Sequence, residues 1–158
     1  MRIVFCPCLV LVFLLTGCGL RVPTDPRGTL DAVRASQELT VGVSHAPPWT
    51  VVRGSRITGT EVDLVRTFAA RLGADPRWVV GGEQHLVDQL EQGEIHLIIG
   101  GITTDTPWTT KVSPTRSYAR SVDNEGKEHK HVMLVQFGEN EFLSELERYL
   151  DERSGKLR

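Results

Sequence analysis

The sequence predicts an α/β domain with a mostly parallel sheet, one antiparallel return strand and helices on both faces. Short apolar runs that suit buried strands alternate with segments whose apolar residues repeat at helical spacing. Glycines follow the predicted helices. The run Ile95–Ile99, apolar except for His96, passes through two glycines into a Thr/Asp/Pro segment, which predicts a central strand that feeds a helix.

Composition narrows the function classes. The chain has 158 residues, with 18 Lys and Arg against 20 Asp and Glu and a formal net charge of -2. This length suits one domain, and the balanced charge argues against a nucleic-acid partner. All three cysteines, Cys6, Cys8 and Cys18, lie near the amino end. The predicted domain therefore has no thiol for a disulfide scaffold, a zinc site or a nucleophile.

Residues 1–17 are predicted to be a lipoprotein signal peptide. A positively charged start precedes an apolar run, Ile3–Leu15, that is too short to span a bilayer. The run ends in Leu15-Thr16-Gly17-Cys18, which resembles the lipobox of bacterial lipoproteins. The resemblance implies cleavage before Cys18 and lipidation of its sulfur. The alternative is an ordinary secretory signal with a chance cysteine.

A tether and the first elements of the domain come next. Residues 18–28 carry two prolines among polar residues without periodicity, which is typical of a spacer between lipid and domain. Residues 29–36 predict a short helix capped by Thr29, and residues 39–44 predict the first strand. Pro47-Pro48-Trp49 ends this strand.

After a turn at Gly54-Ser55, the segment Thr60–Asp63 matches a capping box, in which a hydroxyl and a carboxylate each bind the other residue's backbone N–H. The helix is predicted to continue to Leu72 and to end at Gly73. Glu61 and Asp63 are interpreted as cap and dipole partners rather than as an acid/base pair.

The central part predicts a strand at 77–80, a helix at 83–92 closed by Gly93, and the central strand that begins at Ile95. Unpaired N–H groups at the start of the following helix would lie at the carboxyl edge of the sheet. Open α/β folds hold small anionic or polar ligands at this edge.

The last part returns to the sheet. Residues 112–118 predict an edge or crossover segment, because Pro114 cannot donate to a ladder. A polar connector, 119–130, precedes a strand at 131–137, then a turn and a helix. The predicted inner face of this helix consists of Phe142, Leu143, Leu146, Tyr149 and Leu150. The domain is expected to span 29–150, and residues 151–158 to form a frayed tail.

Four motifs occur in a fixed order: Leu39-Thr40-Val41-Gly42-Val43 with Pro47-Pro48-Trp49, Gly59-Thr60-Glu61-Val62-Asp63-Leu64, Leu90-Glu91-Gln92-Gly93-Glu94-Ile95, and Gly101-Ile102-Thr103 with Thr106-Pro107. In this order, the chain resembles the bacterial extracellular solute-binding proteins of family 3, the periplasmic receptors of polar amino-acid ABC transporters. The likeness covers residues 39–118 and 131–150.

The resemblance implies a two-lobed clamp in which the chain crosses from lobe 1 to lobe 2 and then returns. Here the crossover resembles 113–118 and the return resembles 131–150, with only the polar connector between them. A second lobe needs roughly a hundred residues to bury a core. We therefore expect lobe 1 alone, with lobe 2 absent.

The resemblance also implies ligand-binding residues. Trp49 resembles the aromatic residue that lines the ligand cleft, and Gly101, Ile102 and Thr103 resemble the loop that binds the ammonium and carboxylate groups of the ligand. The alternatives are a rim or core tryptophan, and glycines needed only for backbone conformation.

The position of the family's carboxylate-binding arginine is occupied by Thr109, whose hydroxyl cannot form a bidentate ion pair. Lys111 or Arg116 could substitute. His96 stands where the family usually has Asp. Without lobe 2, the cleft face around Trp49, Ile102 and Trp108 would be an exposed apolar patch.

No motif predicts catalysis, a cofactor or a metal site, and His129 and His131 would form at most half of a metal site. Two hypotheses stay open. One is a lipid-anchored receptor for an amino-acid-like solute that works with an ABC permease. The other is an envelope lipoprotein whose lobe docks a second copy or another envelope protein. Both place the protein outside the cytoplasm, on the periplasmic side or the cell surface, with a weakly bound solute as its ligand in the first.

Overall fold

The computed structural model describes residues 25–154. Its main sheet has five strands in the order β4-β1-β5-β9-β6. β1 is parallel to both β4 and β5, whereas β9 is antiparallel to β5 and to β6. The bounds are Glu38–Val43 for β1, Asp75–Val80 for β4, Leu97–Ile99 for β5, Ser113–Pro114 for β6 and Leu134–Val135 for β9. The predicted mostly parallel sheet with an antiparallel return strand is confirmed, and β5 is its central strand.

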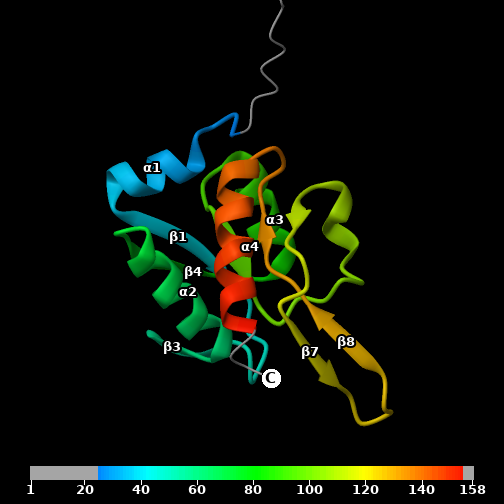
Figure 1. Cartoon of the computed structure of the whole chain (residues 1–158). Helices are drawn as coiled ribbons and strands as arrows, with labels where there is room; N and C mark the ends of the chain where they lie inside the picture. Colours follow the sequence, from blue (N-terminus) through cyan, green and yellow to red (C-terminus); the bar gives the residue numbers. More distant parts are fainter. Residues whose placement is uncertain (1–24, 155–158) are drawn as a thin grey trace, which may run out of the picture.

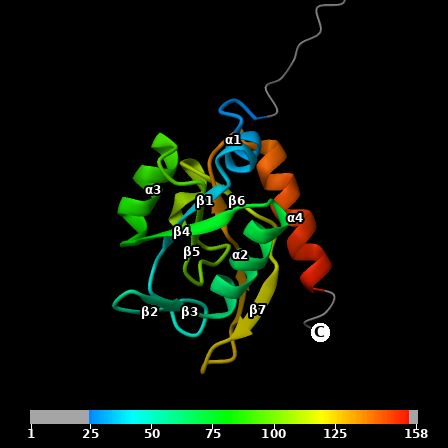
Figure 2. The same ribbon diagram turned by 90° about the vertical axis from the view of Figure 1, so that its left-hand side faces the viewer.

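Helices cover both faces of this sheet (Figure 2), as predicted. One face packs against α1, α2 and α4, and the other packs against α3. The bounds are Thr29–Ser36 for α1, Thr60–Arg71 for α2, Glu83–Gln92 for α3 and Asn140–Ser154 for α4. Successive strand residues point to opposite faces, so Leu97 and Ile99 join one core cluster and Ile98 joins the other. An unbroken apolar run is what a strand buried on both faces requires.

The two core clusters consist entirely of residues between Leu30 and Leu150. In the larger cluster, Phe68 of α2 meets Phe142 of α4 with ring centroids 5.9 Å apart. In the smaller cluster, the apolar residues of α3 pack on β5 and β9.

The helices α1 and α3 have the predicted bounds, but Thr29 does not cap α1. Gly28 precedes the helix in the left-handed conformation and has no side chain to cap it, while Oδ2 of Asp25 accepts the backbone N–H of Leu30 at 3.2 Å. The carboxylate of Glu139, distant in sequence, accepts the backbone N–H groups of Arg27 (2.9 Å) and Thr29 (3.0 Å). A tertiary contact thus replaces the predicted local cap.

The capping box predicted at Thr60–Asp63 is also wrong. Gly59 precedes α2 with φ 134°, and no capping side chain bonds to the first turn. A side chain at Gly59 would collide with the carbonyl of Trp49. The helix then ends as predicted, with Gly73 in the left-handed region at φ 73°.

The helix expected after the central strand is only a single 3-10 turn, η1 (Pro107–Thr110). Thr103, four residues before η1, pairs with His131 in an isolated antiparallel bridge. The backbone N–H of Thr106 donates to the carbonyl of Thr103 at 3.0 Å, so a turn separates this bridge from Pro107.

The polar connector forms a β-hairpin, which projects from the body (Figure 1). Its strands are β7 (Ala119–Val122) and β8 (Glu128–His131). The expected strand at 131–137 is therefore divided between β8 and β9. A smaller hairpin, β2 (Val51–Arg53) and β3 (Arg56–Thr58), turns at Gly54-Ser55 as predicted.

The helix α4 confirms its predicted inner face and is helical to Ser154, where a frayed tail was expected. The predicted signal peptide, Cys18 and most of the tether lie outside the described residues. Within residues 25–154, no helix is long and apolar enough to cross a membrane.

Ending the chain at Lys130 should abolish cooperative unfolding. This truncation removes β9 from the middle of the sheet and removes α4, whose Phe142 and Leu146 are buried in the larger cluster. Urea unfolding followed by circular dichroism measures the effect, and a chain that ends at Ser154 is the control. An unchanged transition in the chain that ends at Lys130 would contradict the assignment of the return segment to the core.

Candidate functional site

The loops that follow β1 and β5 meet at the carboxyl edge of the sheet. The backbone N–H of Ser44 donates to the carbonyl of Ile99 at 3.0 Å. A side-chain carbon built on Gly100 would lie 2.7 Å from Cβ of Ser44, so this approach needs a glycine. The sheet edge at which we expected a ligand is therefore formed by these two loops.

The buried carboxylate of Glu61 ties the glycine loop to α2. Glu61 has no exposed surface. Its Oε2 accepts the backbone N–H groups of Gly100 at 2.7 Å and Gly101 at 3.0 Å. Burial raises the pKa of Glu61, while the hydrogen bonds it accepts act in the opposite direction. The N–H groups of this loop are thus occupied by a side chain of the protein itself.

Tyr118, at the end of the crossover, donates its hydroxyl to Oε1 of Glu61. Burial and the neighbouring Glu61 raise the pKa of Tyr118 far above its usual value. The phenol therefore keeps its proton and acts as a donor. All three partners of Glu61 are donors, which suits an ionised carboxylate.

The imidazole of His131 covers Trp49, with ring centroids 3.9 Å apart and planes 35° apart. Its Nδ1 lies 3.1 Å from the carbonyl of Gly101, and its Nε2 lies 2.8 Å from the hydroxyl of Ser121. Burial lowers the pKa of His131. Because a carbonyl only accepts, a neutral His131 carries its proton on Nδ1 and accepts the Ser121 hydroxyl at Nε2.

The structure brings together Trp49, Gly101 and Thr103 of the predicted ligand-binding residues. A side-chain carbon on Gly101, whose φ is 63°, would lie 2.7 Å from Cδ1 of Trp49. Thr103 pairs with His131 through the isolated bridge. Ile102 differs, because its side chain is 4% exposed and belongs to the smaller core cluster. The expected exposed patch therefore does not include Ile102.

Trp108 and Thr109 both lie in η1. The indole of Trp108 is half-buried against the smaller core cluster, and its Nε1 donates to Oε2 of Glu83 at 3.1 Å. Trp108 is thus packed against α3 rather than fully exposed. Thr109 is exposed.

Neither substitute for the missing arginine is available. Lys111 pairs with Asp88 at 3.3 Å and with Glu91 at 3.1 Å. Arg116 pairs with Glu147 at 2.9 Å and with Asp151 at 2.8 Å. These ion pairs engage both cations with carboxylates of α3 and α4, respectively.

His96 and His129 also have partners within the fold. Nδ1 of His96 accepts the backbone N–H of Thr40 at 3.1 Å, and burial lowers the pKa of His96. Nε2 of His129 lies 2.9 Å from Oδ2 of Asp123 in the hairpin turn. Across residues 25–154, no group of three or more His, Cys, Asp or Glu side chains is arranged to hold a metal ion.

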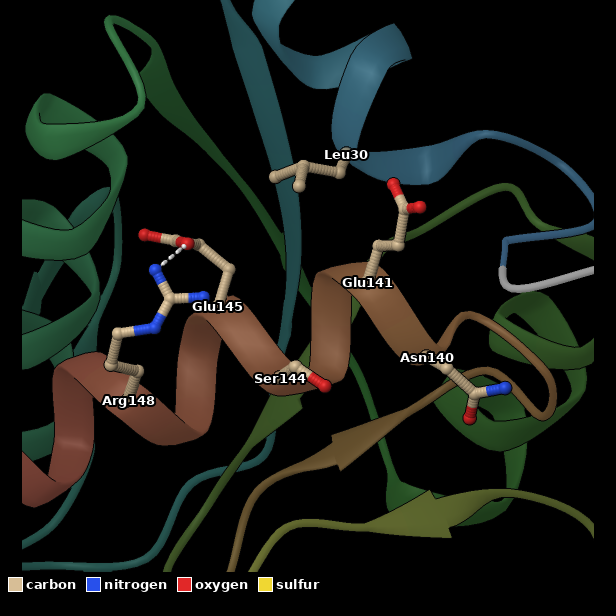
Figure 3. A pocket seen from close by; sticks show the side chains of 6 residues that line it. All are labelled: Leu30, Asn140, Glu141, Ser144, Glu145 and Arg148. Atoms are coloured by element: carbon tan, nitrogen blue, oxygen red, sulfur yellow. Dashed lines mark ion pairs between the residues drawn. The ribbon is translucent and has the colours of Figure 1, made fainter.

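A hollow of about 350 Å³ lies between α1 and α4 (Figure 3). Arg148 on its wall pairs with Glu145 at 2.7 Å, and Glu145 also lies 3.4 Å from Arg71. Leu30 is the apolar residue of the lining. The hollow contains none of the predicted ligand-binding residues.

Sequence reasoning missed the roles of Glu61, Tyr118 and His131. A signal for Glu61 was present, since helical spacing places it on the same face as the buried Val65 and Phe68. No comparable local signal marked His131, whose partners come from three other segments.

Comparisons with known proteins agree with this fold. A family model for the bacterial extracellular solute-binding proteins of family 3 matches residues 39–154. The arginine-bound form of domain 1 from TmArgBP is similar, with a TM-score of 0.67 and 26% identity over 77% of this chain and 98% of that chain. A point mutant of that domain gives a TM-score of 0.71 and 25% identity over 80% and 98%.

An ancestral amino-acid-binding protein, a precursor of cyclohexadienyl dehydratase, gives a TM-score of 0.70 at 13% identity over 81% of this chain and 94% of that chain. At this identity, the likeness concerns the fold alone. No curated protein matches the chain.

Replacing Glu61 by Ala should lower the free energy of unfolding by at least about 3 kcal/mol, because three buried donors lose their acceptor. Asp63→Ala is the matched control, since Asp63 lies in the same turn with an exposed side chain. It should cost less than about 1 kcal/mol. Urea unfolding measures both variants, and equal losses would contradict the central role of Glu61.

Proposed function

Because the chain belongs to the bacterial extracellular solute-binding proteins of family 3, we propose that it is a lipid-anchored solute receptor reduced to one lobe. It binds an amino acid or a similar small polar solute for an ABC-type uptake system, and it is a binding protein rather than an enzyme. The family match spans both the segment before the hairpin and the return segment after it.

One observation carries this proposal. The chain aligns with 98% of a solved domain 1 that is described as arginine-bound, at 26% identity. A single lobe of this fold can therefore hold an amino acid. The hairpin β7–β8 stands where the family would insert lobe 2, and it offers no core of its own, since Val122 is 68% exposed.

The cleft groups limit the affinity. In a two-lobed receptor, most of the ligand surface leaves water only when the lobes close. Here the N–H groups of Gly100 and Gly101 are already bound, and Thr109 replaces the arginine. A free amino acid would keep part of its hydration and lack a bidentate partner. We therefore propose weak binding near Trp49 and Thr103.

The membrane attachment is proposed from the lipobox. Cys18 would carry the diacylglycerol, and residues 18–28 would reach from the lipid to α1. A lipid anchor of two or more chains gives lasting attachment. This arrangement would hold the lobe beside the membrane, where a permease operates.

A second function is favoured by the same occupied cleft. His131 covers Trp49, and Glu61 fills the glycine loop, so the lobe satisfies its own polar groups without a solute. An envelope scaffold that binds a second copy or another protein would need a stable lobe and no bound solute.

Titrating the chain that begins at residue 19 against a panel of amino acids should reveal saturable binding with Kd of roughly 1 mM or weaker. Isothermal calorimetry and amide shifts measure it, with the oligomeric state checked by sedimentation. Absence of binding across the panel would contradict the receptor and favour the scaffold. Micromolar binding to a monomer would contradict the argument that a ligand on one lobe keeps part of its hydration.

Replacing Cys18 by Ser in the full chain should release the protein into the soluble envelope fraction, because the sulfur that receives the lipid is lost. Membrane fractionation with immunodetection measures the change, and Ser36→Ala serves as the control. A variant that stays with the membrane would contradict lipidation at Cys18.

A further inference from the structure

A pocket of about 440 Å³ lies beside the occupied cleft, between α2, the last turns of α4 and the start of β7. Figure 1 shows α2 and α4 near the base of the hairpin. Trp49, Leu64, Tyr118 and Tyr149 contribute aromatic and aliphatic surface to its lining. We name it the aromatic pocket. Its size lies within the range of small-molecule sites.

The tyrosines of the aromatic pocket use their polar ends inside the protein. Tyr118 donates its hydroxyl to Glu61, and Tyr149 donates its hydroxyl to the carbonyl of Leu64 at 3.0 Å. What both residues offer to the pocket is therefore ring surface. Trp49 has one side against His131 and also lines the pocket. Such surfaces favour a planar apolar group.

The pocket also has a cation with no carboxylate partner among residues 25–154. The guanidinium of Arg153 lies 5.6 Å from the ring centroid of Tyr149, a cation–π contact. Asp63, the acid in the lining, lies 3.3 Å from Arg66. A guanidinium held over an aromatic ring is suited to bind a carboxylate through two parallel hydrogen bonds.

The glycine loop is a less favourable place for a ligand carboxylate, because Glu61 already lies there. A ligand carboxylate at Gly100 and Gly101 would compete with Glu61 for the N–H groups and would meet its negative charge. The aromatic pocket offers a cation instead. It supplies the positive charge that is missing at Thr109.

We propose that the aromatic pocket is a ligand site for small aromatic carboxylates, such as an aromatic amino acid or its deaminated analogue. The ring packs among Trp49, Leu64 and Tyr149, and the carboxylate pairs with Arg153. This inference rests on the proposed function, because it gives the class of solute and places it at a site distinct from the glycine loop.

The test uses the chain that begins at residue 19, with 3-phenylpropanoate, L-phenylalanine and 2-phenylethylamine as probes. Both carboxylates should shift amides of α2 and of the end of α4, and the amine without a carboxylate should not. Arg153→Gln should weaken the binding of both carboxylates at least about tenfold, and Arg153→Lys should weaken it less. Arg34→Gln, in the last turn of α1, is the matched control and should leave affinity unchanged.

Equal carboxylate affinities for Arg153→Gln and the unmodified chain would overturn the proposal. So would shifts confined to Gly101 and Thr103, or binding of the amine as tight as that of the carboxylates. If arginine or another amino acid binds at the glycine loop while the aromatic carboxylates do not bind, the receptor function stands and the aromatic site falls. If no solute shifts any amide, both fall.

Discussion

The carboxyl group of Glu61 is buried without exposed surface, and such a polar group is tolerated only when hydrogen bonds replace its water. Its donors lie 39 to 57 positions further along the sequence, in the glycine loop and at Tyr118. Its own backbone N–H donates to the carbonyl of Trp49 at 3.1 Å. Satisfying one carboxylate therefore fixes α2, the loops after β1 and β5, and the crossover in one arrangement.

The same interaction satisfies the backbone groups of the glycine loop. A cleft whose backbone N–H groups faced empty space would need water, a ligand or a second lobe to satisfy them. Here Glu61 satisfies Gly100 and Gly101, and His131 bonds to the carbonyl of Gly101. The polar groups of this loop are thus satisfied within the described residues by side chains of the protein itself.

Local patterns predicted what local physics decides. α3 has its predicted bounds, because an amphipathic run ends at Gly93 in the left-handed conformation. The predicted caps at Thr29 and Thr60 were wrong because tertiary contacts fix both helix starts. Glu139 accepts the N–H of Thr29, and Gly59 packs against the carbonyl of Trp49. The hairpin at 119–130 escaped notice because its outward residues face water and it has no apolar face to reveal a period. For His131, the partners are long-range, so spacing carried no signal.

The geometry of the connector shows how a lobe could be absent without disturbing the sheet. Ala119 and His131 are paired in register, and the N–H of Tyr118 donates to the carbonyl of His131 at 3.1 Å. The two ends of any insertion therefore lie side by side and are held by hydrogen bonds of the lobe itself. The entropic cost of closing a loop rises only slowly with the length of the loop. This junction can therefore hold a short hairpin or a whole domain at a similar cost. The two core clusters do not depend on the hairpin itself, because none of their apolar residues lies between residues 120 and 130.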